Sequence, residues 1–375
     1  MTISHLAVSG YRSLQQLLVP LGPLTLVSGP NGSGKSNLYR ALRLIVAAAR
    51  GDLVGALARE GGLPAVMWAG PERIGRAMRS GELPVQGGPR SQPVRLRLGF
   101  AGDPFSYAIE LGYPAEGRTA FALDPQIKGE WIWAGGPFHP RGLLSERRAA
   151  PTPAAESLGT GPFDGGADPA EQPEVYALRE QILAWRFYAG FRTDDEAPAR
   201  NPGVASRCPA LADDGGDLPA AVQTILENGD GEGLQAAIDD AFPGCRLAVD
   251  TSTAIFRLQF HQTGLLRPLV AAELSDGTLR YVLLAAALFA VRLPPLLVLN
   301  EPESSLHPDL LPPLARLIAT AAERTQVWVI AHAPALIQAL QKIEDCRHHR
   351  LERELGATLL PGQTAIERAA WRWPG

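Results

Sequence analysis

Eight consecutive residues near the start of the chain have the types and spacing that hold phosphate groups. The run Gly29-Pro30-Asn31-Gly32-Ser33-Gly34-Lys35-Ser36 matches G-x-x-x-x-G-K-[ST], between a short apolar run and an apolar helical pattern. The glycines let the backbone turn so that successive N–H groups, with the positive end of the following helix, face one anion. Lys35 would then place its charge on the β- and γ-phosphates of a nucleotide, and the Ser36 hydroxyl would bind Mg²⁺.

An ordinary glycine-rich turn is the competing interpretation of this run. The chain contains three lysines, Lys35, Lys128 and Lys342, and its other basic residues are almost all arginines. Chance is therefore a poor explanation for a lysine at the one position that phosphate binding requires. We interpret the run as a phosphate-binding loop between a strand over Leu24–Ser28 and a helix.

Polar side chains also follow two unbroken apolar runs late in the chain. Asn300 and Glu301 follow Leu296–Leu299, and His332 comes shortly after Val327–Ile330. Such runs are typical of parallel strands buried on both faces, whose carboxyl ends carry catalytic groups. Glu301 is placed to polarise an attacking water and His332 to contact a γ-phosphate. The alternatives are an exposed carboxylate at a strand end and a structural histidine.

A further polar segment, Leu274-Ser275-Asp276-Gly277-Thr278, opens a helix expected over Thr278–Val291. Ser275 or Asp276 would cap such a helix whatever the protein does, because both residue types accept hydrogen bonds from free backbone N–H groups. The position of the segment, shortly upstream of the Leu296–Leu299 strand, favours a role beside the nucleotide instead.

In this order, the motifs resemble those of an ABC-type ATPase head. GYRSL before the loop, LSDGT in place of LSGGQ, and EPESSLHPDLL are similar to RecF/SMC-like "AAA family ATPase" proteins, which are soluble ATPases rather than transporter subunits. The resemblance implies an α/β P-loop NTPase with a mixed sheet core, an antiparallel β-subdomain and a helical lobe. It also implies that ATP and Mg²⁺ are the cofactors.

The resemblance assigns a role to each matching position. Glu301 matches the general base, His332 the switch histidine and Ser304–His307 the D-loop, while Lys35 acts on the phosphates. The residues expected at the nucleotide are Arg12, Gly29, Pro30, Asn31, Gly32, Ser33, Gly34, Lys35, Ser36, Asn37, Ser275 and Gly277. Ser275 and Gly277 would cap the γ-phosphate held by a second subunit. A head-to-tail homodimer that forms on ATP binding is therefore implied.

Two positions depart from the family pattern. Asn300 stands where the family has the Walker B aspartate. Its amide oxygen can accept from a Mg²⁺-bound water but brings no negative charge, so we expect weaker Mg²⁺ binding and slow turnover. No glutamine fits the Q-loop securely: Gln126 is a candidate metal contact, with an exposed strand residue as the alternative.

Composition bounds the partners and the compartment. The formal net charge is -4 and the isoelectric point is near 6.0, so any DNA contact must use a local basic patch, such as Arg347–Arg350 or Arg95 with Arg97. A solvated face is the commoner reason for such patches. The apolar run Tyr281–Val291 is too short to cross a bilayer, and three scattered cysteines indicate a reducing compartment. We expect a cytoplasmic protein with no membrane partner.

The pattern along the chain suggests one ABC-ATPase-like head over 1–375. We expect a loop-bearing half with antiparallel strands over 1–135, a flexible insertion over 136–172, a helical and β lobe over 173–267, and a half with the signature, Walker B strand and histidine over 268–375. The first and last strands should share one sheet.

Three functions compete at this point. The first is an ATP hydrolase acting in DNA maintenance or phage defence, with DNA or an effector or nuclease protein as a possible partner. The second, motivated by Asn300, is a nucleotide-dependent binding module or sensor with little hydrolysis. The third, a transporter ATPase subunit, is disfavoured because its signature would read LSGGQ.

Overall fold

The computed structural model describes residues 2–72, 74–82, 95–114, 120–148, 163, 170–363 and 371–374. The chain divides into two compact units that interleave along the sequence. The first unit comprises Met1–Gly22, Gly29–Ala184 and His349–Gly375, and the second comprises Pro23–Ser28 and Trp185–His348. Among the described residues, none of the helices is both long and apolar enough to span a membrane.

The first unit is built on an antiparallel sheet, whose described strands run in the order β2-β1-β4-β5-β6-β7. Their bounds are β1 Thr2–Tyr11, β2 Leu14–Pro20, β4 Leu96–Asp103, β5 Phe105–Gly112, β6 Gln126–Ala134 and β7 Leu143–Arg148. A separate hairpin near the carboxyl end joins β16 (Glu352–Glu354) to β17 (Ala357–Leu359), and β17 packs against β2. The antiparallel strands expected within residues 1–135 are thus present.

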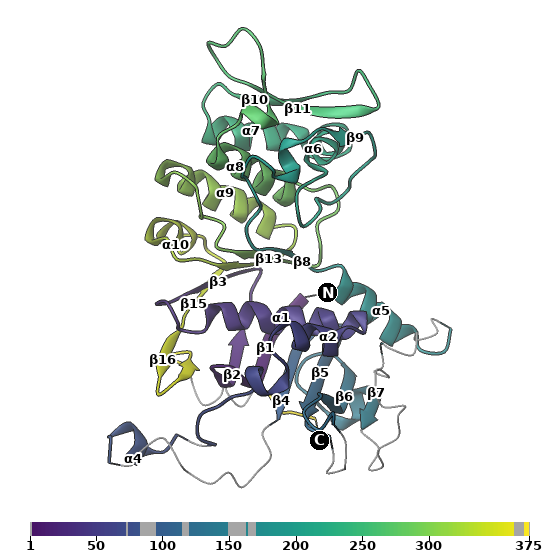
Figure 1. Cartoon of the computed structure of the whole chain (residues 1–375), viewed down its shortest axis with the longest axis vertical. Helices are drawn as coiled ribbons and strands as arrows, with labels where there is room; N and C mark the ends of the chain where they lie inside the picture. Colours follow the sequence, from purple (N-terminus) through teal and green to yellow (C-terminus); the bar gives the residue numbers. More distant parts are fainter. Residues whose placement is uncertain are drawn as a thin grey trace. The chain divides into compact units, whose positions relative to one another are not determined.

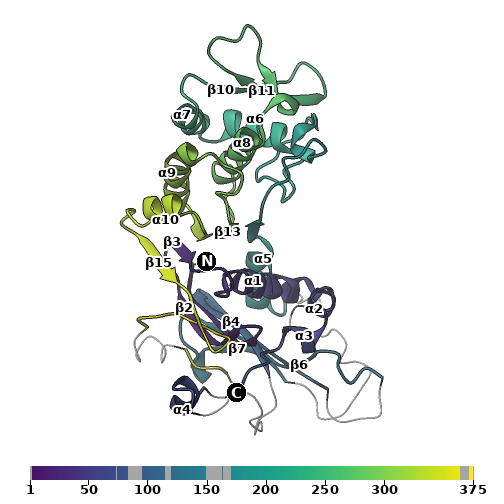
Figure 2. The same cartoon turned by 60° about the vertical axis from the view of Figure 1, so that its left-hand side comes forward.

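Helix α1 (Lys35–Arg50) packs against β1 and β4 of this sheet and against helices α2 and α5 (Figure 2). Its apolar side chains recur at helical spacing and are buried, which holds the residues before its first turn in place. The other helices of this unit are α2 (Leu53–Arg59), α3 (Leu63–Val66), η1 (Pro140–Gly142), α4 (Arg76–Arg79) and α5 (Pro173–Leu183).

The second unit contains a five-stranded sheet of described strands in the order β15-β3-β14-β13-β8. The pairings of β3 with β14, β14 with β13, and β13 with β8 are parallel. Their bounds are β3 Leu24–Ser28, β8 Arg186–Tyr188, β13 Leu296–Asn300, β14 Gln326–Ile330 and β15 Cys346–Arg350. Strands β3 and β14 are fully buried, as is β13 up to Asn300, so the predicted buried parallel strands are confirmed.

Helices and a small antiparallel sheet complete the second unit (Figure 1). Helices α6, α7, α8 and α9 pack on one another, and α6 and α7 also contact β10. The bounds of the helices are η3 Pro198–Arg200, α6 Leu218–Asn228, α7 Gly231–Ala241, η4 Ala271–Glu273, α8 Asp276–Leu288, η5 Pro308–Leu310, α9 Leu311–Ala322 and α10 Pro334–Leu340. Those of the strands are β9 Gly203–Val204, β10 Arg246–Asp250, β11 Ile255–His261 and β12 Leu269–Val270.

The structure differs from the sequence expectations at two places. Only β3 of the early strands joins the late strands, while β1 belongs to the antiparallel sheet of the first unit. The stretch 136–172, expected to be irregular, contains β7, which pairs with β6; its alternation of half-buried and exposed residues is that of an edge strand. Residues 149–162 and 164–169 of that stretch lie outside the described residues.

Candidate functional site

The phosphate-binding loop has a backbone that requires glycine. Gly29, Gly32 and Gly34 have φ angles of 147°, 77° and 105°, in the region that other residues rarely adopt. A Cβ atom added at Gly34 would lie 2.1 Å from Thr358 Oγ1, so space also excludes a larger residue there. Helix α1 begins directly after Gly34, and the free N–H groups of its first turn follow the loop.

Lys35 closes this loop from within. Its ammonium donates hydrogen bonds to the carbonyl oxygens of Gly29 at 2.6 Å and Pro30 at 2.9 Å, and the residue is only 3% exposed. The neighbouring Ser36 is exposed in the first turn of α1, and Asn31 is also exposed. The loop therefore combines a held positive charge with accessible backbone and hydroxyl groups, which is the arrangement that binds phosphate.

Below the loop lies a chain of hydroxyl groups that the sequence did not reveal. Thr358 Oγ1 donates to the Ser33 carbonyl oxygen at 2.8 Å and lies 2.7 Å from Ser13 Oγ. A hydroxyl has one proton, so Ser13 is the donor in the second bond. Asn37 Nδ2 in turn donates to Ser13 Oγ at 2.8 Å. Hydrogen bonds from strand β17 and from the turn before β2 thus fix the loop, and all three segments belong to the first unit.

Arg12, expected near the nucleotide, has a partner within the first unit. Its guanidinium donates to Glu60 Oε2 through Nε at 3.2 Å and Nη2 at 2.7 Å, and Tyr11 Oη donates to the same oxygen at 2.7 Å. Arg12 also has a φ angle of 48°. A nucleotide contact by Arg12 stays a prediction and would have to compete with Glu60.

Gln126, the Q-loop candidate, lies on β6 of the first unit, separated from β1 by β4 and β5. Its Oε1 atom accepts a hydrogen bond from Lys128 Nζ at 2.6 Å. Because that oxygen already faces a cation, this geometry favours the alternative of a strand residue over a metal contact.

In the second unit, the carboxyl end of β13 carries Asn300 and Glu301. The Asn300 Oδ1 atom is buried and has no hydrogen-bond partner among the described residues. A buried oxygen without a hydrogen-bond partner destabilises the folded state. Such an oxygen is suited to accept a hydrogen bond from a ligand such as a Mg²⁺-bound water. Glu301 has a φ angle of 52°, a strained conformation for a non-glycine residue of the kind that gathers at functional sites.

Glu301 and His332 meet at this edge of the sheet. Glu301 Oε1 lies 3.0 Å from His332 Nε2, and their side chains are 40% and 35% exposed. Glu303 fixes the backbone at the histidine, because Glu303 Oε1 accepts from the backbone N–H groups of His332 and, at 2.9 Å, of Ala333. The structure therefore brings the expected base and the expected switch histidine into contact.

Arg280 is a member of this cluster that sequence reasoning missed. It extends from α8, is 7% exposed, and its Nη2 atom lies 3.3 Å from the Glu301 carbonyl oxygen. Burial lowers the pKa of Arg280, while the carboxylates of Glu303 and Glu301 act in the opposite direction. A positive charge is thus held close to the two carboxylates. Arg280 lies in a largely apolar helix, so its sequence neighbours do not indicate this role.

The signature segment is also a helix cap. Ser275 Oγ accepts a hydrogen bond from the Thr278 N–H at 3.2 Å at the start of α8. A Cβ added at Gly277 would lie 3.0 Å from the Ser305 carbonyl oxygen, so α8 starts directly beside the D-loop segment. Ser275, Gly277 and Ser305 line a hollow of about 650 Å³ in the second unit. Both interpretations of Ser275, cap and exposed ligand contact, are compatible with this geometry.

The two small basic patches noted in the sequence differ in how far internal partners occupy them. Arg97 Nε donates to Glu110 Oε2 at 2.6 Å, and Arg95 pairs with the other oxygen of the same buried carboxylate. His348 Nε2 lies 2.7 Å from Ser28 Oγ, and His349 Nε2 lies 2.6 Å from the Pro20 carbonyl oxygen. Arg95, Arg97 and the two histidines thus have internal partners. Arg347 and Arg350 are exposed, so DNA binding through them stays a prediction.

Comparison with known proteins gives matches of three kinds. A family described as "AAA domain, putative AbiEii toxin, Type IV TA system" matches residues 24–337. An OLD nuclease of Thermus scotoductus (strain ATCC 700910 / SA-01) is 43% identical over 44 residues, or 12% of this chain and 8% of that protein. The chain therefore matches only a small part of the length of this curated relative.

Two solved structures are similar over nearly their whole length. The SMC head domain from Thermotoga maritima is 17% identical with a TM-score of 0.51, over 96% of this chain and 97% of that chain. The SmcHead bound to the C-winged helix domain of ScpA is 14% identical with a TM-score of 0.55, over 98% of this chain and 99% of that chain. At such identities the likeness concerns the fold.

The predicted fold class is confirmed by these similarities, and the family match extends from β3 to α10 and includes the loop, the signature segment and both strand-end groups. The chain belongs to the AAA-domain family of that description, and its fold is that of a P-loop, RecF/SMC-like ABC-type ATPase head.

Proposed function

We propose that this chain binds ATP with Mg²⁺ on the loop Gly29–Ser36 and hydrolyses it. One observation carries the proposal: the three loop glycines have positive φ angles, and Lys35, the first residue of helix α1, is buried against the loop carbonyls. Backbone N–H groups, a helix amino end and a fixed ammonium together stabilise a triphosphate. Membership in an ATPase family supports the same assignment.

Glu301 is the proposed general base. It would accept a proton from the attacking water as the water oxygen bonds to the γ-phosphorus and the bond to the β–γ bridging oxygen breaks, which yields ADP and phosphate. His332, 3.0 Å from Glu301 Oε1, would orient that carboxylate and contact the γ-phosphate. The strained φ angle of Glu301 supports this role, because such conformations persist where the surroundings require them.

Ser36 and Asn300 are the residues that would hold Mg²⁺. Both offer oxygen ligands, which Mg²⁺ prefers, and the Asn300 Oδ1 atom is buried without a partner among the described residues. The ion, when bound, neutralises charge on the phosphates. Because Asn300 is neutral where an aspartate is usual, we propose weakened Mg²⁺ affinity and slow turnover, with ATP binding preserved.

The second part of the proposal is a head-to-tail dimer with two nucleotides. Ser275 and Gly277 would cap the γ-phosphate bound by another copy. Ser275 is exposed and Gly277 half-buried beside the hollow near Ser305, which supports this. We further propose a role in DNA maintenance or phage defence, with DNA or an effector or nuclease protein as a partner. The short match to an OLD nuclease supports that context.

A nucleotide-dependent sensor with little hydrolysis is the second candidate, and Asn300 is the observation that favours it. A phosphate-release assay on the wild type and Lys35→Ala separates the two functions. Phosphate release that depends on Lys35 supports the ATPase. ATP binding without Lys35-dependent phosphate release would instead support the sensor. A protein that binds no ATP in either form would contradict both.

The dimer is tested independently with Glu301→Gln, which should retain ATP and remain dimeric. Light scattering at saturating ATP and Mg²⁺ should report a mass twice that of the monomer for this variant. Lys35→Ala in the same background is the control and should stay monomeric. A monomeric Glu301→Gln variant at saturating ATP contradicts the dimer but leaves the hydrolysis assay unaffected.

A further inference from the structure

The signature segment carries a negative charge at a position that the proposed dimer makes sensitive. Asp276 stands where the LSGGQ pattern has glycine, and its side chain is 60% exposed at the start of α8. In the proposed dimer, this end of α8 approaches the triphosphate of the second copy. An unpaired carboxylate there would repel the phosphates, since like charges at short range raise the free energy of association.

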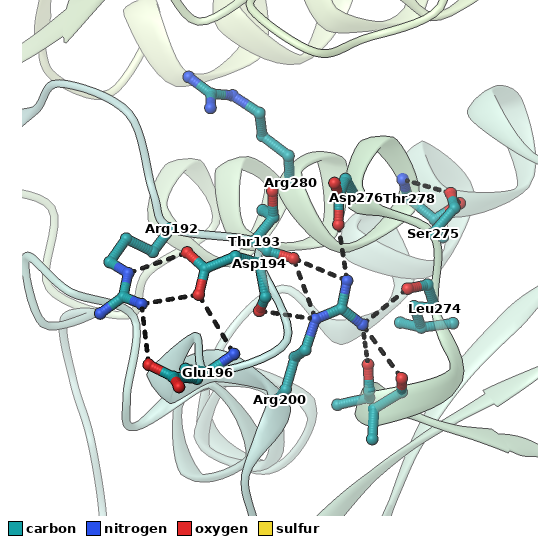
Figure 3. Close-up of polar contacts among 12 residues, drawn as sticks. Arg192, Thr193, Asp194, Glu196, Arg200, Leu274, Ser275, Asp276, Thr278 and Arg280 are labelled. Atoms are coloured by element: carbon teal, nitrogen blue, oxygen red, sulfur yellow. Dashed lines mark hydrogen bonds and ion pairs between the residues drawn. The ribbon is translucent and has the colours of Figure 1, made fainter.

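Arg200 pairs with this carboxylate. Its Nη2 atom donates to Asp276 Oδ1 at 2.7 Å and to the Thr193 carbonyl oxygen at 2.7 Å (Figure 3). Arg200 itself lies at the end of η3, outside the signature segment, and its side chain is only 8% exposed. The neutralising charge therefore comes from a buried position that holds it in one place.

The same guanidinium also fixes the backbone that leads into α8. Arg200 Nη1 donates to the Leu274 carbonyl oxygen at 2.8 Å, to that of Ala272 at 3.1 Å and to that of Ala271 at 3.3 Å. Nε donates to the carbonyl oxygens of Thr193 and Asp194, at 3.0 and 3.1 Å. Figure 3 shows these hydrogen bonds from Arg200 to the backbone at residues 193–194 and at residues 271–274. A planar guanidinium makes such a set, whereas a lysine ammonium has too few donors.

The neighbouring acidic side chains have arginine partners of their own. Arg192 pairs with Asp194 at 2.6 Å and lowers its pKa, with Glu196 at 4.0 Å from the same guanidinium. Arg267 holds the pKa of Glu273 at about 2. Arg200 is thus the cation that the described structure pairs with Asp276.

We propose that Arg200 is the positioning residue of the signature segment: it neutralises Asp276 and fixes the carbonyls of residues 271–274, so that α8 can face the triphosphate bound by a second copy. The inference rests on the proposed ATP-dependent dimer. It explains how LSDGT can replace LSGGQ, because the added carboxylate comes with a buried counter-charge.

The test is a double-mutant cycle in the Glu301→Gln background, read as the dimer dissociation constant at saturating ATP. Arg200→Gln should raise this constant about tenfold, because one unit charge is left unpaired at the interface. Asp276→Asn, an exposed change that retains the fold, should leave the constant equal or lower. Arg200→Gln with Asp276→Asn should return to within about threefold of the parent if charge is the cause.

Ionic strength separates charge from loosened structure. Added salt screens repulsion between exposed charges. The difference in dimer dissociation constant between Arg200→Gln and the parent should therefore become smaller as salt is added. Arg316→Gln is the matched control: Arg316 also pairs with an aspartate, Asp240, through two bonds of 2.9 and 2.8 Å in the same unit. This control should dimerise like the parent, and ATP affinity of the monomers should be equal throughout.

The outcomes distinguish the two proposals. A Glu301→Gln parent that stays monomeric with ATP overturns the dimer and this inference together. A parent that dimerises, with Arg200→Gln matching it or with no recovery in the double variant, overturns the inference that Arg200 acts by neutralising Asp276 and leaves the dimer intact. If Arg200→Gln does not fold, the Asp276→Asn variant decides instead. Weaker dimerisation of Asp276→Asn than of the parent would also overturn the inference.

Discussion

Glu301 Oε1 at the end of β13 lies 3.0 Å from His332 Nε2, which follows the neighbouring parallel strand β14. Glu303 accepts hydrogen bonds from the backbone N–H groups of His332 and Ala333, which fixes the backbone that carries the histidine. Two strand ends that are adjacent in the sheet thus fix a carboxylate and an imidazole in one pair. Such a pair can accept a proton from water and respond to the γ-phosphate.

Glu301→Gln should lower the turnover number for ATP by about 100-fold to 10,000-fold, the range usual for a lost general base. The affinity for ATP should change little, because the phosphate-binding loop is untouched. Steady-state phosphate release and equilibrium binding of a fluorescent ATP analogue measure the two effects. Glu227→Gln, an exposed change on α6, is the control and should keep full activity. Equal turnover in Glu301→Gln and the wild type would refute the role of Glu301 as base.

Asn300→Asp should increase Mg²⁺ affinity and turnover. The change adds a negative charge to a buried oxygen that has no partner among the described residues, and charge-assisted bonds are roughly twice as strong as neutral ones. Phosphate release as a function of Mg²⁺ concentration gives both quantities. If neither Mg²⁺ affinity nor turnover increases, Asn300 is not the cause of slow turnover.

Thr358→Val should weaken both the fold and ATP binding. The change removes the hydroxyl that donates to the Ser33 carbonyl and accepts from Ser13, which should lower the free energy of unfolding by about 1–3 kcal/mol. Because Ser33 lies in the phosphate-binding loop, the dissociation constant for ATP should rise severalfold. Denaturant unfolding and ATP binding measure these effects.

Thr358→Ser is the matched control, since it keeps the hydroxyl and removes only a methyl group. It should bind ATP like the wild type. If serine and valine impair ATP binding equally, the hydroxyl chain has no part in shaping the loop.

Cys208 and Cys346 should react slowly with a thiol reagent in the folded protein. Burial, assisted by Asp217, raises the pKa of Cys208 to about 12, and burial raises that of Cys346 to about 11. A raised thiol pKa means fewer thiolates at a given pH, so at about pH 8 labelling should be more than about 100-fold slower than for a free thiol. The rate should increase with pH.

Ellman's reagent measures this rate, and the denatured protein, with its three cysteines, is the control. Labelling of folded Cys208 and Cys346 as fast as in the denatured chain would show that the two thiols are exposed.

The sequence was sufficient for features whose signal is local. The loop Gly29–Ser36 is defined by its own spacing, and the apolar runs before Glu301 and His332 predicted the two parallel strands that the structure contains. Their neighbouring positions in the sheet follow from the strand–helix–strand order, since parallel strands end at the same edge.

Features that depend on distant segments left no such signal. Thr358 is 345 residues from Ser13, and Arg200 is 76 residues from Asp276, so no local pattern links either pair. Arg280 lies in a largely apolar helix, and no local pattern links it to Glu301. The same reason explains why the first strand, β1, does not share a sheet with the last strands as the sequence predicts: apolar alternation defines a strand but not its neighbours.

A crystal structure with Mg²⁺ and a non-hydrolysable ATP analogue tests the central claim most directly. The account predicts a triphosphate on the amino end of α1, held by Lys35 and Ser36, with Ser275 and Gly277 of a second copy against its γ-phosphate. An analogue bound elsewhere, or a loop Gly29–Ser36 without nucleotide in crystals grown at saturating ligand, would contradict it.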